Sequence, residues 1–335
     1  MGVRIPQSAA SNVRSALRRP RARSAVSYSL LIIVLVFAVL AIRSNWRGVH
    51  QALSMLRPSD LVLAELLALA ATGALFQAWV CLMRGLSDTP IAGRELRTMF
   101  FCSQLGKYVP GSVWPALIQA EIGRRNRLSR TVIVTAYALA LLAGVAGGGV
   151  FSLGVLAHRN NGWITIGACA GFAGGALLMI AMSRRSATNF FWGRLLRSRL
   201  NTSALESLRN PTLVRCAIWT VVGWTAMGLH AWAITRPLGA AAGDAIFVSG
   251  AFALAWTVGL LAVPLPAGAG LREVVLVVTV GALIGHEAAT SMALVSRAIM
   301  LGNDLVLSLL AGLPSLLVTI RNQHRIAVEP EVQPR

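Results

Sequence analysis

The sequence predicts an all-α polytopic membrane protein with about eight transmembrane helices and a re-entrant hairpin. Hydrophobic residues make up 56% of the 335 residues and charged residues only 13%, with a mean hydropathy of +0.66. Soluble domains are usually less apolar and about a quarter charged. The apolar residues also form long blocks, several of them close to the roughly 20 residues that a helix needs to cross a bilayer.

The apolar blocks predict the spans in chain order. They cover 27–42, 61–83, 131–157, 163–183, 212–235, 243–263, 271–285 and 290–320. The first block is short and follows a basic segment, 1–26, so a cleaved signal peptide is the competing interpretation. A weak cleavage signal and the next span, which follows soon, favour an uncleaved helix. We therefore expect one transmembrane domain over 27–320 and a cytoplasmic tail over 321–335.

The basic residues predict the orientation of the spans. With the N-terminus inside, the predicted cytoplasmic segments hold 22 of the 31 Lys and Arg residues, and the predicted outer segments hold five. Cytoplasmic loops of membrane proteins collect positive charge in this way. Both termini are thus expected on the cytoplasmic side of a bacterial-type plasma membrane. The same bias accounts for the net charge of +19 without nucleic acid binding.

Residues 98–118 are apolar enough to enter the bilayer, but they cannot cross it in this orientation. Basic residues flank the segment on both sides, with Arg97 before it and Arg124 after it. A re-entrant hairpin that enters from the cytoplasm and turns near Pro110 and Gly111 satisfies both observations. Irregular backbone at membrane depth is tolerated where protein or a watery cavity covers it.

A second interruption, "VPLPAGAGLRE", separates the blocks 243–263 and 271–285. In one arrangement both blocks are full spans, which is slightly favoured because 243–263 alone is long enough to cross. In the other they form a hairpin that enters from outside, with its tip at Pro264 to Gly270. That hairpin would mirror the first one across the membrane, as in transporters built from an inverted repeat around a midplane site.

Lys107 is the only lysine in the chain and lies three residues before Pro110. A lysine at the bilayer centre costs about 2.5–3.5 kcal/mol on insertion scales, so such residues usually serve a function. One interpretation is that Lys107 holds an anionic head group in a cavity, with backbone N–H groups near Gly111 as further donors. An equally weighted one is that it extends to the cytoplasmic interface. For Tyr108 and Trp114, interface anchoring is favoured over lining a cavity.

Four more ionisable residues lie in the last two blocks. Arg272 and Glu273 follow the second interruption and project about 100° apart on a helix, so they need not pair. We interpret Arg272 as a phosphate ligand and Glu273 as a ligand for a cation or proton, with a hydrated helix start as the alternative. Arg297 and Asp304 are seven residues apart on one helix face. They face the bundle interior as site residues or as a structural ion pair.

Enzyme motifs are absent from the sequence. It has no H-E-x-x-H, P-loop or G-x-S-x-G motif, so no enzyme is expected. The histidines are scattered and the cysteines lie apart within apolar blocks, so neither a metal nor a cofactor is expected. Gly144 and Gly148, and the glycines at 167, 171 and 175, recur every four residues, as in close helix packing.

Three stretches resemble a known family. "QLGKYVPGSVW" resembles the Gly-Lys-Tyr and Pro-Gly signature of the flippase-like transmembrane domain of lysylphosphatidylglycerol synthases, and "VPLPAGAGLREVVLV" resembles its late Pro-x-Gly-x-Gly-x-Arg-Glu stretch. "SRAIMLGNDLVLSLLAG" resembles its last helix. The resemblance spans roughly 27–320 and implies a bundle that translocates a lipid. The full-length enzymes carry a soluble aminoacyl-transferase domain after these spans, and the sequence stops at Arg335, so synthase activity is not expected.

These observations together predict a protein that moves a lipid between leaflets. The lipid would be an anionic or aminoacylated phospholipid or a polyprenyl-linked lipid. Lys107, Arg272 and Arg297 would attract its phosphate, and Glu273 and Asp304 would balance them. The alternative is a non-transporting membrane subunit that docks a cytoplasmic glycosyltransferase or lipid synthase through the Arg-rich loop 184–211.

Overall fold

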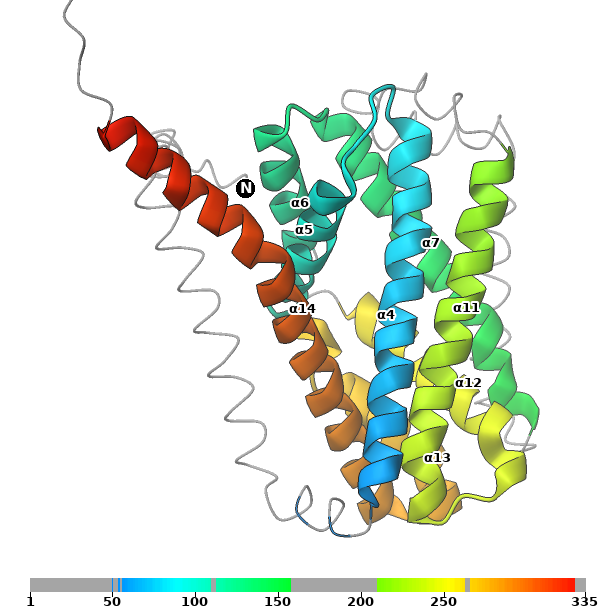
Figure 1. Cartoon of the computed structure of the whole chain (residues 1–335). Coiled ribbons are helices and arrows are strands. Elements are labelled where there is room, and N and C mark those ends of the chain that lie inside the picture. Colours follow the sequence, from blue (N-terminus) through cyan, green and yellow to red (C-terminus); the bar gives the residue numbers. More distant parts are fainter. Residues whose placement is uncertain are drawn as a thin grey trace, which may run out of the picture. The chain divides into compact units, whose positions relative to one another are not determined.

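The computed structural model describes residues 56–109, 113–157, 210–262 and 266–328, together with His50 and Ser54. The chain divides into a unit up to Asn45 and a unit from Trp46, and every described residue belongs to the second. The described residues form helices and no strand (Figure 1). The predicted all-α class is confirmed.

The described part of the chain forms eight α-helices. They are α4 (Pro58–Leu86), α5 (Gly93–Gln104), α6 (Trp114–Arg125), α7 (Arg130–Ser152), α11 (Asn210–Thr235), α12 (Ala245–Leu261), α13 (Leu271–Ile284) and α14 (His286–Val328). Short 3-10 helices join or extend them: η1 (Leu105–Tyr108), η2 (Leu153–Ala157), η3 (Arg236–Leu238), η4 (Ala242–Asp244) and η5 (Pro266–Gly268).

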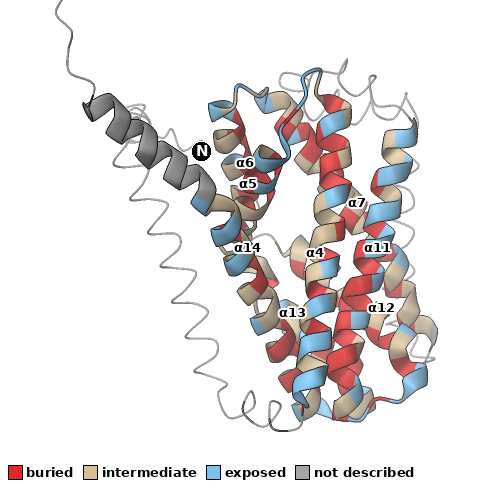
Figure 2. Ribbon diagram, viewed as in Figure 1, coloured by how far each residue is buried: buried red, intermediate tan, exposed pale blue. Residues whose placement is uncertain are grey.

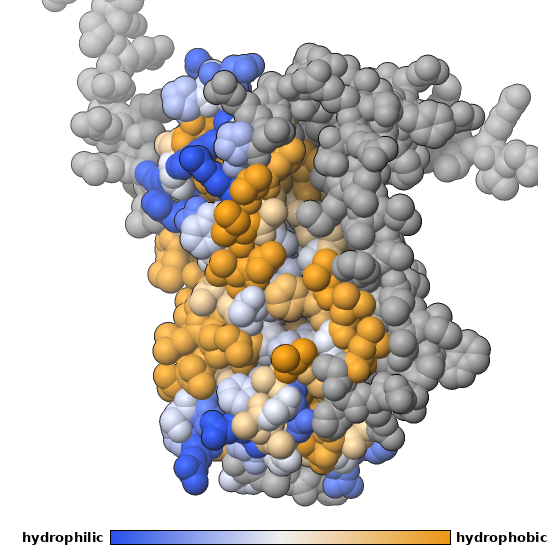
Figure 3. All heavy atoms as spheres, turned by 90° about the vertical axis from the view of Figure 1, so that its right-hand side faces the viewer, coloured by the Kyte–Doolittle hydropathy of each residue, from blue (hydrophilic) through white to orange (hydrophobic). Residues whose placement is uncertain are grey.

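Five of these helices are long and apolar enough to cross a membrane. They are α4, α7 with η2, α11 with η3, α12 with η4, and α14. They correspond to predicted spans, so the polytopic membrane class is confirmed. Figure 3 shows apolar residues across the middle of one face of the molecule and hydrophilic residues toward both ends. The predicted spans 27–42 and 163–183 and the predicted docking loop 184–211 lie outside the described residues.

Small residues set the packing of the long helices. The buried alanines of α4 recur every three or four residues and so share one face: Ala64, Ala68, Ala71, Ala74 and Ala78. This face packs along α11, where a Cβ added at Gly223 would lie 3.0 Å from Leu75. Small residues let helix backbones approach closely in membranes. Exposed apolar residues such as Val62 and Val221 lie on other faces of the same helices, where lipid can cover them (Figure 2).

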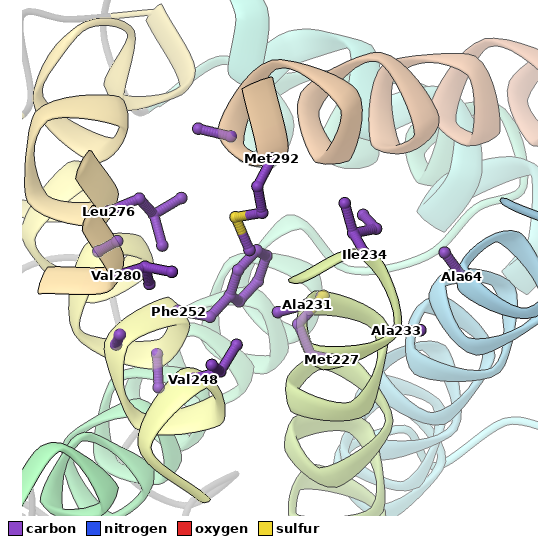
Figure 4. Packing of buried hydrophobic residues seen from close by; sticks show 14 of the residues in the cluster. Ala64, Met227, Ala231, Ala233, Ile234, Val248, Phe252, Leu276, Val280 and Met292 are labelled. Atoms are coloured by element: carbon purple, nitrogen blue, oxygen red, sulfur yellow. The ribbon is translucent and has the colours of Figure 1, made fainter. Parts of the chain in front are cut away.

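Phe252 of α12 is the centre of the larger core cluster. Its ring is fully buried and lies among Leu276 and Val280 of α13, Met292 of α14 and Ile234 of α11 (Figure 4). An aromatic ring fills such an irregular space with a large apolar area. The cluster joins α11, α12, α13 and α14.

The first interrupted segment, 93–125, is a pair of short helices. Helices α5 and α6 have 12 residues each and pack against each other. A Cβ at Gly106 would lie 2.8 Å from the backbone nitrogen of Pro115, so glycine permits this close approach. Buried Gln119 donates a hydrogen bond to Ser103 Oγ at 3.0 Å. The predicted turn near Pro110 and Gly111 lies outside the described residues.

The second interrupted segment consists of α12, η5 and α13. Gly268 has a φ of 66°, and a Cβ there would lie 2.6 Å from the Cα of Gly259, so the turn requires glycine. The turn brings η5 into contact with η1. The two interruptions of the chain therefore meet, with α5 and α6 above them and α13 and much of α12 below them in the view of Figure 1.

Candidate functional site

A cavity of about 190 Å³ lies where the two interrupted segments meet. Its wall combines residues of η1 and η5 with residues of the surrounding long helices. Most of them are apolar, among them Phe100, Met227, Trp256, Leu260 and Met300. Four charged residues also line it: Lys107, Arg272, Arg297 and Asp304. Residues from two distant parts of the sequence thus share one site.

Lys107 forms an ion pair with Asp304 at the cavity wall. Its Nζ lies 2.7 Å from Asp304 Oδ2, and the Asp304 side chain is only 5% exposed. The hydroxyl of Tyr108 donates a second hydrogen bond to the same carboxylate oxygen at 2.6 Å. Hydrogen bonds to ionised groups are stronger than neutral ones. Lys107 is therefore held at the cavity, and Tyr108, for which the interface was favoured, lies there too.

Arg297 of α14 pairs with Glu273 of α13. The second carboxylate oxygen of Glu273 accepts a hydrogen bond from the backbone N–H of Gly270 at 2.6 Å, which caps the start of α13. Glu273 therefore stabilises the first turn of α13, directly after the second interruption, and links α13 to α14. Arg272 and Glu273 do not pair with each other, as expected from their directions on the helix.

Arg272 has a different environment from the other two cations. Its guanidinium carbon lies 4.6 Å from the centre of the Phe252 ring, and one of its N–H groups donates to Met300 Sδ at 3.4 Å. Thioether sulfur is a weak acceptor. Among the described residues, no carboxylate forms an ion pair with Arg272. Its guanidinium thus lines the cavity with hydrogen-bonding capacity left over.

Helix α14 connects the cavity to both interrupted segments. Arg297 reaches α13, and Asp304, two turns further along, reaches η1. Beyond the cavity, Thr98 Oγ donates to the Ala311 carbonyl at 2.9 Å. Arg297 and Asp304 therefore share a face of one helix, as predicted, but each pairs with a different segment rather than with the other.

The remaining predicted site residues lie further away or outside the described part. Trp114 is half-buried at the start of α6 and is not among the residues that line the cavity. Its interface position stays a prediction, and Pro110 and Gly111 lie outside the described residues. Sequence reasoning missed Met300, which lines the cavity, and Phe252, whose ring contacts Arg272, because apolar residues within spans show no pattern that distinguishes these roles from ordinary core packing.

A family model described as lysylphosphatidylglycerol synthase TM region matches residues 26–308. The chain belongs to this family. The match begins at the end of the basic N-terminal segment and includes both interrupted segments and the charged part of α14. The resemblance carried by the two sequence motifs is thereby confirmed. A comparison with curated proteins finds no match.

Proposed function

We propose that this member of the lysylphosphatidylglycerol synthase TM region family moves a phosphate-bearing lipid between membrane leaflets and carries out no covalent chemistry. The environment of Arg272 is the observation that supports lipid movement most directly. Arg272 is a cation at the wall of a mostly apolar cavity, and among the described residues it has no carboxylate partner. A planar guanidinium matches a phosphate group geometrically and electrostatically.

The lengths of the helices support a topology with two re-entrant hairpins. A helix of 12 residues is about 18 Å long, roughly half of a 30 Å hydrocarbon core. Helix α5 follows the basic cytoplasmic flank, so η1 would lie near mid-depth. Because η5 contacts η1, the second turn would lie there too. Helix α12 with η4 is long enough to cross by itself. Helix α13, with 14 residues, is about 21 Å long and too short to cross. The mirrored hairpin is therefore preferred over two full spans because of the length of α13 and the contact between η5 and η1.

In this topology the cavity is the place where the head group would pass the middle of the bilayer. Its phosphate would bind Arg272, and Lys107 and Arg297, each paired with a carboxylate, would line the cavity beside it. The acyl chains would stay in the surrounding hydrocarbon, because a cavity of about 190 Å³ is too small for a whole two-chain lipid. The basic segments would place both termini on the cytoplasmic side of the plasma membrane.

Reconstituted proteoliposomes test the proposed function. A fluorescent phosphatidylglycerol is added to one leaflet and its arrival in the other is followed by quenching. We expect wild-type protein to accelerate the movement and Arg272→Gln to reduce the rate at least tenfold, since hydrogen bonds to charged groups contribute about 1.5–3 kcal/mol. Arg236→Gln is the matched control, because exposed Arg236 lies over the Trp232 ring, away from the cavity. Equal rates with protein-free liposomes would reject the proposal.

A further inference from the structure

The charged side chains around the cavity determine which lipid head groups can bind there. We infer that the site selects lipids whose head group has one net negative charge and no cationic group, such as a phosphodiester linked to a neutral alcohol or sugar. This inference rests on the proposed function and narrows its substrate class. The argument depends on which charged side chains already have partners within the protein.

Asp304 in the cavity wall and Glu273 beside it each already have a cationic partner. Asp304 accepts from the Lys107 ammonium at 2.7 Å and from the Tyr108 hydroxyl at 2.6 Å. Glu273 pairs with Arg297 and caps the backbone at Gly270. A lipid ammonium would have to displace one of these partners and leave that partner's charge uncompensated. Exchanging ion-pair partners in a poorly hydrated site is unfavourable.

Among the described residues, one of the cations that line the cavity forms no ion pair. Three cationic side chains and Asp304 line the cavity, and Glu273, which is not a lining residue, pairs with one of the three cations, Arg297. Counted with Glu273, these described side chains carry one net positive charge. It resides on Arg272, whose contacts are an aromatic ring and a thioether. Arg272 is also the second residue of α13, where the helix dipole adds further positive potential. A single phosphodiester charge complements this environment.

The apolar wall indicates a lipid as the source of that phosphate, rather than a free ion. Phe100, Met227, Trp256 and Leu260 line the same cavity. They offer favourable contacts to the glycerol and upper acyl region of a lipid, but none to inorganic phosphate. Competition between the two ligands therefore separates these sources.

Native mass spectrometry of the detergent-solubilised full chain tests the inference. Three lipids with the same acyl chains are compared: phosphatidylglycerol, phosphatidylethanolamine and lysylphosphatidylglycerol, whose head groups carry charges of about −1, 0 and +1. We expect phosphatidylglycerol to bind at least tenfold more tightly than the others. Arg272→Gln should abolish this preference, Arg236→Gln should keep it, and millimolar inorganic phosphate should fail to displace the lipid.

A second variant tests the charge count independently of Arg272. Asp304→Asn releases Lys107 and raises the net charge of the cavity by one, so its preference should move toward phosphatidic acid, whose phosphate monoester carries up to two negative charges. An unchanged preference in this variant would overturn the inference. So would equal or tighter binding of either amine-bearing lipid to the wild type, displacement by phosphate, or no lipid binding.

The two proposals fail in different ways. Transport of all three lipids at equal rates, together with unselective binding, would reject the inference about charge and leave lipid movement established. Selective binding without movement in proteoliposomes would reject the transport function and leave the assigned head-group site intact.

Discussion

At the scale of single residues, the site is defined by which charges have partners. Lys107 and Asp304 are 197 positions apart in the sequence and meet at 2.7 Å. The sequence identified both as intramembrane charges, but it could not pair them, since no local pattern links residues so far apart. Likewise, Arg272 has no ion-pair partner among the described residues because Glu273 pairs with Arg297 instead, and this pairing depends on how α13 and α14 pack.

The Lys107–Asp304 pair makes a testable contribution to stability. Lys107→Ala would leave a carboxylate that is 5% exposed with the Tyr108 hydroxyl as its remaining described side-chain partner. We expect a loss of about 1–3 kcal/mol, less than for a fully buried pair because the Lys107 side chain is 38% exposed. Thermal unfolding in detergent measures this. The double variant Lys107→Ala, Asp304→Asn should recover part of the loss, and strictly additive effects of the two substitutions would contradict the pairing.

At the scale of elements, the two interruptions are the distinguishing feature of the fold. Apolar length and basic flanks predicted the first short-helix pair, because Arg97 and Arg124 cannot both be cytoplasmic around a crossing helix. The same criteria could not decide between two full spans and a mirrored hairpin for 243–285, because the two apolar blocks of this segment are compatible with both arrangements. The contact between η1 and η5 is what favours the mirrored hairpin.

Cysteine accessibility tests the mirrored hairpin. In a chain without native cysteines, single cysteines replace Asp88, Ala242, Ala269 or His286. We expect a membrane-impermeant thiol reagent to label Ala242→Cys and His286→Cys from outside and Asp88→Cys from the cytoplasmic side. Ala269→Cys, next to η5, should resist labelling from the cytoplasm because the turn lies at mid-depth. Labelling there as fast as at Asp88→Cys would show that α12 and α13 are full spans.

At the scale of the whole molecule, composition alone identified a polytopic membrane protein, and five of the predicted spans form helices of sufficient length. The two motifs also identified the family that matches residues 26–308. What composition could not supply is the cavity, because it arises where η1, η5 and α14 converge. The shape of such a site depends on the turn at Gly268 and on buried rings such as Phe252. The periodicity of apolar residues in the sequence does not predict either feature.

The central claim is that lipid passes through this cavity, and Met300 offers the most direct test. Its sulfur lies 3.4 Å from an Arg272 nitrogen. In the chain without native cysteines, Met300→Cys is reconstituted and treated with a methanethiosulfonate reagent, with Asp88→Cys as the labelled control outside the cavity. We predict that modification at position 300 stops lipid movement, that a reductant restores it, and that the control keeps its rate. Mass spectrometry confirms that position 300 is fully modified. An unchanged rate of lipid movement in that protein would contradict passage of lipid through the cavity.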